Sequence, residues 1–196
     1  MARSLHPSPG LSPPGVPYVG SLNNSGGTLT GSNAGLSLTS ANLTEIRGIT
    51  GADLGTVTFT TGPLVYGSLQ GGGFFNTTGS LLITLNPNVL GGKLSGGATL
   101  FNGSFEYVYN FPYLSWTAEG GGLYLLQGAA YGTLPNGSNG QAFINETFYG
   151  SFNSNGMFTG TVVSGSIDVN PEPGTLGLFA TGLVGVAGAV RRKLRT

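Results

Sequence analysis

The clearest β-hairpin signal in this 196-residue chain is Ser151-Phe152-Asn153-Ser154-Asn155-Gly156-Met157-Phe158-Thr159-Gly160. Asn155-Gly156 stands between two runs rich in aromatic and β-branched residues, and both residues tolerate the positive φ of a tight turn. The runs on either side, residues 142–149 and 157–163, have the composition of strands. This part of the chain therefore predicts two antiparallel strands joined by a short loop.

The same pattern of strand and turn continues over the rest of residues 21–169. Period-two alternation or short apolar runs predict further strands over residues 56–60, 81–85, 104–109 and 164–169. Gly-Gly and Asn-Gly pairs separate these runs, and no window shows helical periodicity. We predict an all-β body, an antiparallel β-sandwich or barrel-like domain with Gly/Asn-rich turns. A sandwich of roughly nine to eleven strands fits the length, at about 8–12 residues for each strand and turn.

The composition excludes several classes of function. Only 7% of residues are charged, and there are 37 glycines and no cysteine, so disulfide and thiolate chemistry are excluded. Residues 1–170 hold three basic and six acidic side chains, a net charge of −3 with no basic patch. A nucleic acid is therefore not the expected partner.

Motifs for catalysis or metal binding are absent from the sequence. The single histidine, His6, lies in a Pro-rich segment, which excludes a Ser-His-Asp triad or a multi-histidine metal site in the body. Glu106, Glu119 and Glu146 are the carboxylates that could in principle hydrolyse a glycoside. We favour the interpretation that each is a solvent-facing strand or turn residue. The prediction is a protein that is not an enzyme and needs no cofactor and no metal.

One aromatic segment, residues 111–116, has two interpretations. It contains Phe111, Tyr113 and Trp116, the only tryptophan, and Pro112 indicates a loop or an edge strand. Tyr113 and Trp116 are therefore candidates for stacking on the faces of carbohydrate rings. The favoured alternative is that these rings pack in the core beneath a long loop.

The N-terminal residues 1–20 are Pro-rich, and we expect them to be disordered. They contain no apolar segment of the kind found in a signal peptide. Our hypothesis is that the export signal precedes them in the gene.

The C-terminal residues 170–196 form a separate segment with three parts. Pro171, Glu172 and Pro173 are expected to form a rigid, exposed break. Residues 175–190 are apolar throughout and predict one transmembrane helix of roughly 24 Å, a short span against a hydrocarbon core of about 30 Å. A basic cluster follows directly and would stay in the cytoplasm, leaving the body outside. The basic residues of this cluster are Arg191, Arg192, Lys193 and Arg195.

This tail resembles the PEP-CTERM sorting signal of Gram-negative bacteria, in which a Pro-Glu-Pro motif, an apolar helix and a basic end occur in that order. The resemblance is limited to about the last 26 residues. It implies processing by an exosortase, a membrane-embedded cysteine transpeptidase, and a bacterium that makes exopolysaccharide and biofilm. A plain C-terminal anchor helix is the alternative interpretation of the tail.

Two functions follow from these observations. The first is an exported, non-enzymatic cell-surface or biofilm-matrix protein, held in the inner membrane as a precursor and then sorted and cleaved through its tail. Its partners would be the exosortase, the membrane and extracellular polysaccharide. The second is a secreted carbohydrate-binding or carbohydrate-active protein that an uncleaved helix anchors.

Overall fold

The computed structural model describes residues 20–46, 48–86, 99–105, 114–135 and 137–171. All regular structure within these ranges belongs to one 12-stranded antiparallel sheet, and they contain no helix, so the all-β prediction is confirmed. The strands are β1 (Gly20–Ser32), β2 (Gly35–Ile46), β3 (Ile49–Thr50), β4 (Gly55–Thr60), β5 (Leu64–Ser68), β6 (Gly72–Phe75), β7 (Ser80–Leu85), β8 (Thr99–Phe105), β9 (Leu114–Gly120), β10 (Leu123–Thr133), β11 (Asn139–Phe152) and β12 (Phe158–Pro171).

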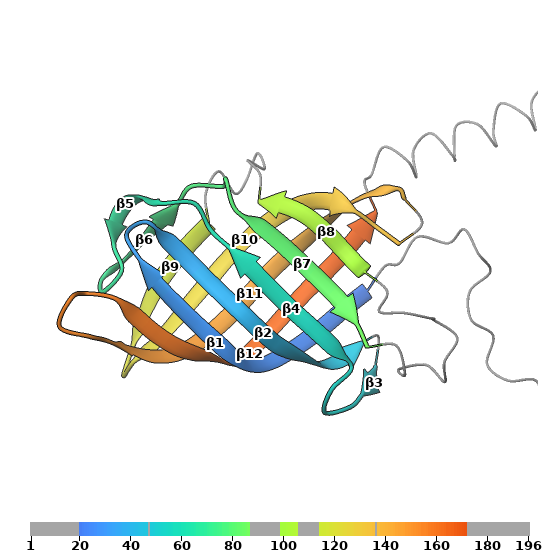
Figure 1. The fold of residues 1–196 in the computed structure, drawn as a ribbon, viewed down its shortest axis with the longest axis horizontal. Coiled ribbons are helices and arrows are strands. Elements are labelled where there is room, and N and C mark those ends of the chain that lie inside the picture. The colour runs from blue at the N-terminus through green and yellow to red at the C-terminus, as the bar shows by residue number, and fades with distance from the viewer. Residues whose placement is uncertain (1–19, 47, 87–98, 106–113, 136, 172–196) are drawn as a thin grey trace, which may run out of the picture.

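Eight of these strands close into an antiparallel barrel (Figure 1). Around the ring the order is β12, β1, β2, β4, β7, β8, β10 and β11, and β11 then pairs with β12. The pairing of β1 with β12, from opposite ends of the body, completes the ring. Of the two architectures predicted, the chain therefore forms the barrel and not the sandwich, because its first and last strands bond to each other and leave no edge between them.

The barrel wall branches at β10. Residues 130–133 of β10 pair with β8, whereas residues 123–127 pair with β9. Beyond β9 the sheet continues through β6 to β5, which is its last strand. The β5–β6 hairpin is also tied to the β1–β2 turn, where the N–H of Leu64 donates to the carbonyl of Asn33 at 2.8 Å. This extension lies toward the end of the barrel opposite the point where β12 ends (Figure 1).

The hairpin predicted over residues 151–160 joins β11 and β12, and Phe152 pairs with Phe158 at its base. The Asn153 side chain organises the loop, since its Oδ1 accepts from the N–H groups of Asn155 and Met157 at 2.9 and 3.0 Å. Gly156 has a φ of 74°, the left-handed conformation for which glycine is suited. The two strands expected over 157–163 and 164–169 are one long strand, β12, which continues to Pro171.

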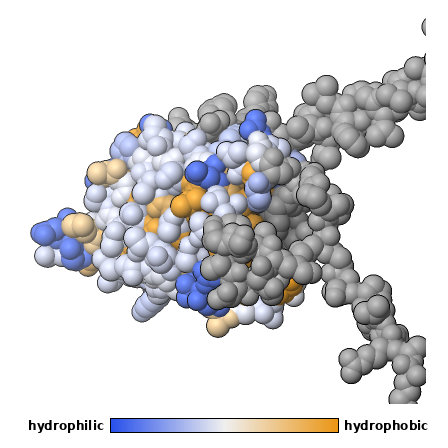
Figure 2. All heavy atoms as spheres, turned by 45° about the vertical axis from the view of Figure 1, so that its right-hand side comes forward, coloured by the Kyte–Doolittle hydropathy of each residue, from blue (hydrophilic) through white to orange (hydrophobic). Residues whose placement is uncertain are grey.

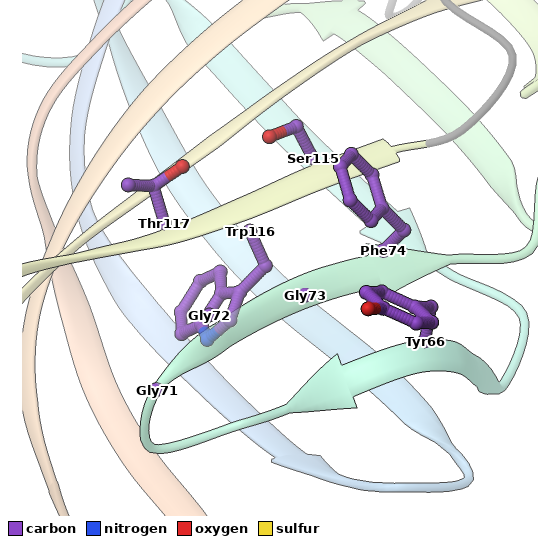
Figure 3. A pocket seen from close by; sticks show the side chains of 8 residues that line it. All are labelled: Tyr66, Gly71, Gly72, Gly73, Phe74, Ser115, Trp116 and Thr117. Atoms are coloured by element: carbon purple, nitrogen blue, oxygen red, sulfur yellow. The ribbon is translucent and has the colours of Figure 1, made fainter.

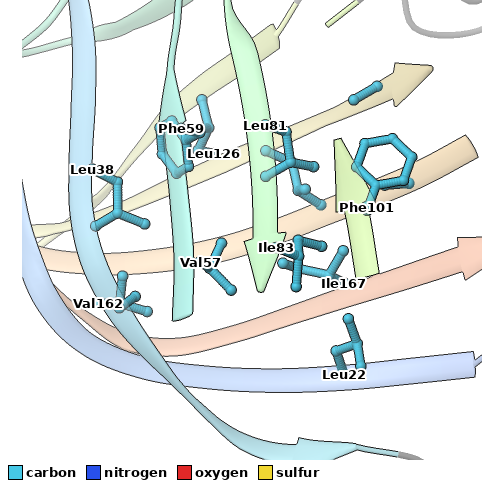
Figure 4. Close-up of a cluster of buried hydrophobic side chains, with 14 of the residues drawn as sticks. Leu22, Leu38, Val57, Phe59, Leu81, Ile83, Phe101, Leu126, Val162 and Ile167 are labelled. Atoms are coloured by element: carbon cyan, nitrogen blue, oxygen red, sulfur yellow. The ribbon is translucent and has the colours of Figure 1, made fainter. Parts of the chain in front are cut away.

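Along most of each strand, side chains alternate between the barrel interior and its outer face, and bulges interrupt this alternation locally. Along β7, Leu81, Ile83 and Leu85 are buried while the residues between them face outward. Figure 4 shows leucine, valine, isoleucine and phenylalanine side chains from strands around the ring meeting in the interior. The barrel is therefore filled by its own side chains, as expected for one of eight strands.

The outer face is built mainly from small neutral residues. The hydroxyls of Thr56 and Thr84 lie 2.7 Å apart across β4 and β7, and those of Thr60 and Ser80 lie 3.0 Å apart. Figure 2 shows one face on which most described residues are of intermediate hydropathy and few are strongly hydrophilic. This surface explains how a chain with 7% charged residues presents polar groups to solvent.

Within the described ranges no helix is long and apolar enough to cross a membrane. The apolar run 175–190, for which the sequence predicts a transmembrane helix, lies outside the described residues, as does the N-terminal segment 1–19.

Candidate functional site

The first residue of the predicted sorting motif belongs to the barrel itself. Pro171 is the last residue of β12, lies opposite Gly140 of β11 and is buried. The expectation of an exposed break at this proline is therefore wrong. The last position of a strand accommodates proline because the missing N–H ends the ladder there without interrupting it. The other predicted tail residues, Glu172, Pro173, Arg191, Arg192, Lys193 and Arg195, lie outside the described residues.

Trp116 is not available to a carbohydrate. Its side chain is 1% exposed and its Nε1–H donates to the carbonyl oxygen of Leu69 at 2.8 Å. The indole stacks on Tyr124 with ring centroids 5.0 Å apart and meets Phe158 edge to face at 5.5 Å. The stacking hypothesis is wrong for this residue, because its position on β9 points inward. Tyr113, the other candidate, lies outside the described residues.

A shallow groove lies instead on the outer face of β5, β6 and β9. Tyr66 pairs with Phe74, and Phe74 pairs with Ser115, so these three residues form one row across the strands. Tyr66 is 73% exposed and Phe74 is 40% exposed. Their ring centroids are 6.4 Å apart, with the ring planes inclined by 38°. Figure 3 shows the two rings side by side on neighbouring strands, with Trp116 on the other side of the sheet.

Three consecutive glycines, Gly71, Gly72 and Gly73, form the floor of this groove (Figure 3). Its volume is about 230 Å³, and the hydroxyls of Ser115 and Thr117 border it on β9. A Cβ on Gly73 would lie 2.2 Å from the carbonyl oxygen of Tyr66, so the close approach of β5 and β6 requires a glycine there. The floor of the groove therefore carries no side chains, because the strands pack too closely for a Cβ at Gly73, and the rings of Tyr66 and Phe74 lie beside it.

The three glutamates considered as catalytic candidates differ in their exposure to solvent. Glu119 is exposed near the end of β9, and Glu106 lies outside the described residues. Glu146, by contrast, is 0% exposed, so the expectation of a solvent-facing residue is wrong. Its neighbours Asn145 and Thr147 take the outward positions on β11, and the alternation of the strand places Glu146 inside.

Glu146 forms a polar pair with Asn24 inside the apolar core. Asn24 Nδ2 donates to Glu146 Oε2 at 3.1 Å, while Asn24 Oδ1 and Glu146 Oε1 are buried without a partner. Burial raises the pKa of Glu146 from 4.5 to about 8, partly offset by the hydrogen bond from Asn24. The carboxyl is therefore neutral over most of the physiological pH range.

Groups that could hold a metal are not assembled in the part of the chain that the structure describes, where no three His, Cys, Asp or Glu residues cluster. The described residues instead form two features. One is a groove on the outer face that is lined by uncharged residues, and the other is the buried, neutral carboxyl of Glu146 beside Asn24.

Tyr66 and Phe74 were not among the residues predicted to form a site. The sequence does contain a pattern that indicates them, since one aromatic lies on each side of the run Gly71-Gly72-Gly73, where the β5–β6 hairpin turns into β6. Which side of the sheet each ring occupies depends on the bulge between Leu64 and Tyr66, and this irregularity cannot be read from alternation alone.

Comparison with known proteins identifies the tail. A family model described as the PEP-CTERM protein-sorting motif matches residues 171–193. No curated protein and no solved structure matches the chain significantly. The chain therefore carries a PEP-CTERM sorting signal at its C-terminal end, which indicates export and sorting by an exosortase-type enzyme.

Proposed function

We propose that this chain is a non-enzymatic protein of the bacterial cell surface or biofilm matrix, delivered and cleaved through its PEP-CTERM signal. In this proposal the apolar helix at 175–190 and the basic cluster at 191–195 hold a precursor in the inner membrane, with the barrel outside the cytoplasm. The exosortase then separates the barrel from this anchor.

The observation that carries the proposal is the junction between barrel and signal. The last strand of the barrel ends at Pro171, which is also the first residue that the sorting-motif model matches. The signal thus begins at the last residue of β12, and residues beyond Pro171 can be removed without taking any of the described strands from the sheet. A barrel whose termini pair with each other through β1 and β12 would keep its closed ring after cleavage.

The non-enzymatic part of the proposal rests on Glu146. A glycosidase needs two carboxyl groups that face a substrate cleft from both sides of the scissile bond. Glu146 is sealed in the core, and the side chain it contacts is the amide of Asn24. This arrangement suits a structural role for the carboxyl.

The second candidate is a carbohydrate-binding or carbohydrate-active protein that keeps its anchor helix. The groove beside Tyr66 and Phe74 favours the binding version of this alternative, since two exposed rings stand next to hydroxyl groups. The two candidates differ in the fate of the tail.

The test is the C-terminal mass of the protein recovered from its native host, with and without the host's exosortase. We expect a body that ends within residues 171–174 only when the exosortase is present. The double variant Pro171→Ala, Pro173→Ala should accumulate as full-length precursor. Pro63→Ala, which changes an exposed loop proline, should be processed normally. An intact C-terminus in the presence of the exosortase would overturn the proposal and make residues 175–190 a permanent anchor.

A further inference from the structure

We propose that the groove on the outer face of β5, β6 and β9 binds a segment of a neutral polysaccharide, with Tyr66 and Phe74 stacking on its sugar rings. This inference names the ligand class of a surface protein and so extends the proposed function, but it rests on the groove alone.

The aromatic pair provides the stacking surface. Sugar rings present apolar C–H groups on their faces, and the negative face of an aromatic ring attracts such groups. Tyr66 is 73% exposed, although burial of a ring this size is strongly favoured by the hydrophobic effect. With centroids 6.4 Å apart, Tyr66 and Phe74 together offer an apolar surface wider than one ring.

Polar groups adjoin this surface in positions that suit sugar hydroxyls. Ser115 and Thr117 border the groove on β9, on the same side of the sheet as the rings. The row continues across the barrel wall, since Ser115 pairs with Gln127 of β10 and Gln127 pairs with Asn145 of β11. Hydroxyl and amide side chains both donate and accept, as do the hydroxyls of a sugar.

Charge selects a neutral polymer over an anionic one. The described residues that line the groove are all uncharged. Residues 1–170 hold three basic and six acidic side chains, a net charge of −3. A polyanion would thus gain no ion pair from the described residues of the groove, and the net negative charge would repel it at longer range.

The groove is built on paired strands and lies toward the end of the barrel opposite the end of β12 (Figure 1). Its side chains stand on paired strands, so little conformational entropy is lost on binding. β5 and β6 lie toward the end of the barrel opposite the end of β12 at Pro171 (Figure 1). A body attached through its C-terminal end would therefore present this groove outward.

Binding is tested with the purified full chain in detergent and a panel of neutral linear polysaccharides, comprising β-1,4-glucan, β-1,3-glucan, dextran, mannan and galactan oligomers. We expect saturable binding of at least one of them, measured by isothermal titration calorimetry. Tyr66→Ala and Phe74→Ala should each raise the Kd at least tenfold. Ser115→Ile, which fills the groove with a side chain suited to a strand, should do the same. Alginate, a polyanion, should bind at least tenfold more weakly.

The matched control is Tyr149→Ala, which removes a tyrosine that is 57% exposed on β11 and does not line the groove. Its Kd should stay within twofold of the unsubstituted chain. Thermal unfolding of each variant, followed by circular dichroism, separates lost binding from lost folding.

Three results would overturn the inference. They are no binding to any polymer of the panel, equal loss of binding in Tyr149→Ala, or sedimentation that shows a dimer abolished by Tyr66→Ala, which would assign the groove to self-association. None of these results depends on cleavage of the tail. Conversely, a failure of processing in the host would leave the binding measurement unaffected, so the two proposals can fail separately.

Discussion

Asn24 donates a hydrogen bond from Nδ2 to Oε2 of Glu146 at 3.1 Å inside the barrel, although 122 positions separate the two residues in sequence. Gly165 of β12 pairs with both residues, with Asn24 on β1 and with Glu146 on β11. The three residues therefore form one row across three neighbouring strands. Among the described residues Glu146 carries the one fully buried carboxyl, and this row places it next to the β1–β12 pairing that closes the barrel.

The stability of the barrel should fall as the pH rises. The pKa of Glu146 is about 8 in the folded chain and 4.5 as its ordinary value, so the folded state holds a proton that the unfolded state releases between these pH values. Linkage then predicts that the free energy of unfolding decreases by about 1.4 kcal/mol for each pH unit across this window. The stabilisation from the protonated Glu146 is fully present below pH 4.5 and is lost as the pH rises through about 8. Urea unfolding at intervals from pH 5 to 9 measures it.

Glu146→Gln is the control for this pH dependence. Glutamine keeps the shape of the protonated carboxyl and brings an N–H donor for Asn24 Oδ1, which is now without a partner. We expect the variant to lose most of the slope between pH 5 and 8 and to be more stable than the unsubstituted chain at pH 9. An unchanged slope would show that other groups cause the pH dependence.

Gly165→Ala should destabilise the barrel strongly. A Cβ at this position would lie 2.1 Å from Asn24 Oδ1 and 2.1 Å from Glu146 Oε2. Overpacking of this kind costs about 1–3 kcal/mol, to which loss of the polar pair would add. The midpoint of chemical unfolding measures the effect.

Two further variants test the cause. Adding Asn24→Ala to Gly165→Ala makes room for the methyl group, so the double variant should lose less stability than the sum of the single variants. Gly71→Ala, where the nearest atom to an added Cβ is Ser68 Oγ at 3.0 Å, should cost much less than Gly165→Ala. If the losses of stability in Gly165→Ala and Asn24→Ala were fully additive, the added methyl group would not be in contact with Asn24.

Trp116 should behave as a buried reporter of folding and not as a ligand contact. It is the only tryptophan and is 1% exposed, so its fluorescence should be blue-shifted, insensitive to iodide and red-shifted on unfolding. Trp116→Phe leaves the carbonyl of Leu69 without its donor and creates a small cavity, which should cost about 1–3 kcal/mol. Polysaccharide binding by the folded variant should stay within twofold. Loss of binding at unchanged stability would show that the indole contacts the ligand.

Cleavage of the tail should leave Pro171 on the released body. This residue is buried and paired with Gly140 at the end of β12, so removing it would require the strand end to separate from β11. Intact-mass analysis of the released protein should therefore place its last residue at or after Pro171. A body that ends at Asn170 or earlier would show that processing precedes closure of the barrel.

Local chemistry made much of this architecture predictable. The Asn155-Gly156 hairpin, the strand over 56–60 and the strand over 81–85 were all correctly placed, because period-two alternation and turn residues act over a few neighbouring positions. The sorting signal was predictable for the same reason, since its parts are contiguous in the chain.

Other features depend on partners that are distant in sequence. Barrel closure requires β1 to pair with β12, and nothing in either strand alone specifies that partner. The position of Glu146 inside the barrel follows from the register of β11, and its neutral state follows from burial beside Asn24. Trp116 lies in the core and Tyr66 on the outer face, because the side of the sheet that a ring occupies depends on its place in the alternation and on bulges.

The sequence by itself thus determined the class of fold, the absence of cysteine chemistry and the sorting signal, because these depend on composition and contiguous pattern. Only the tertiary structure decided which strands close the ring, which aromatics face solvent and which carboxyl is buried. The physical reason is that a side chain's exposure and pKa depend on the surface packed around it, which strands distant in the chain supply.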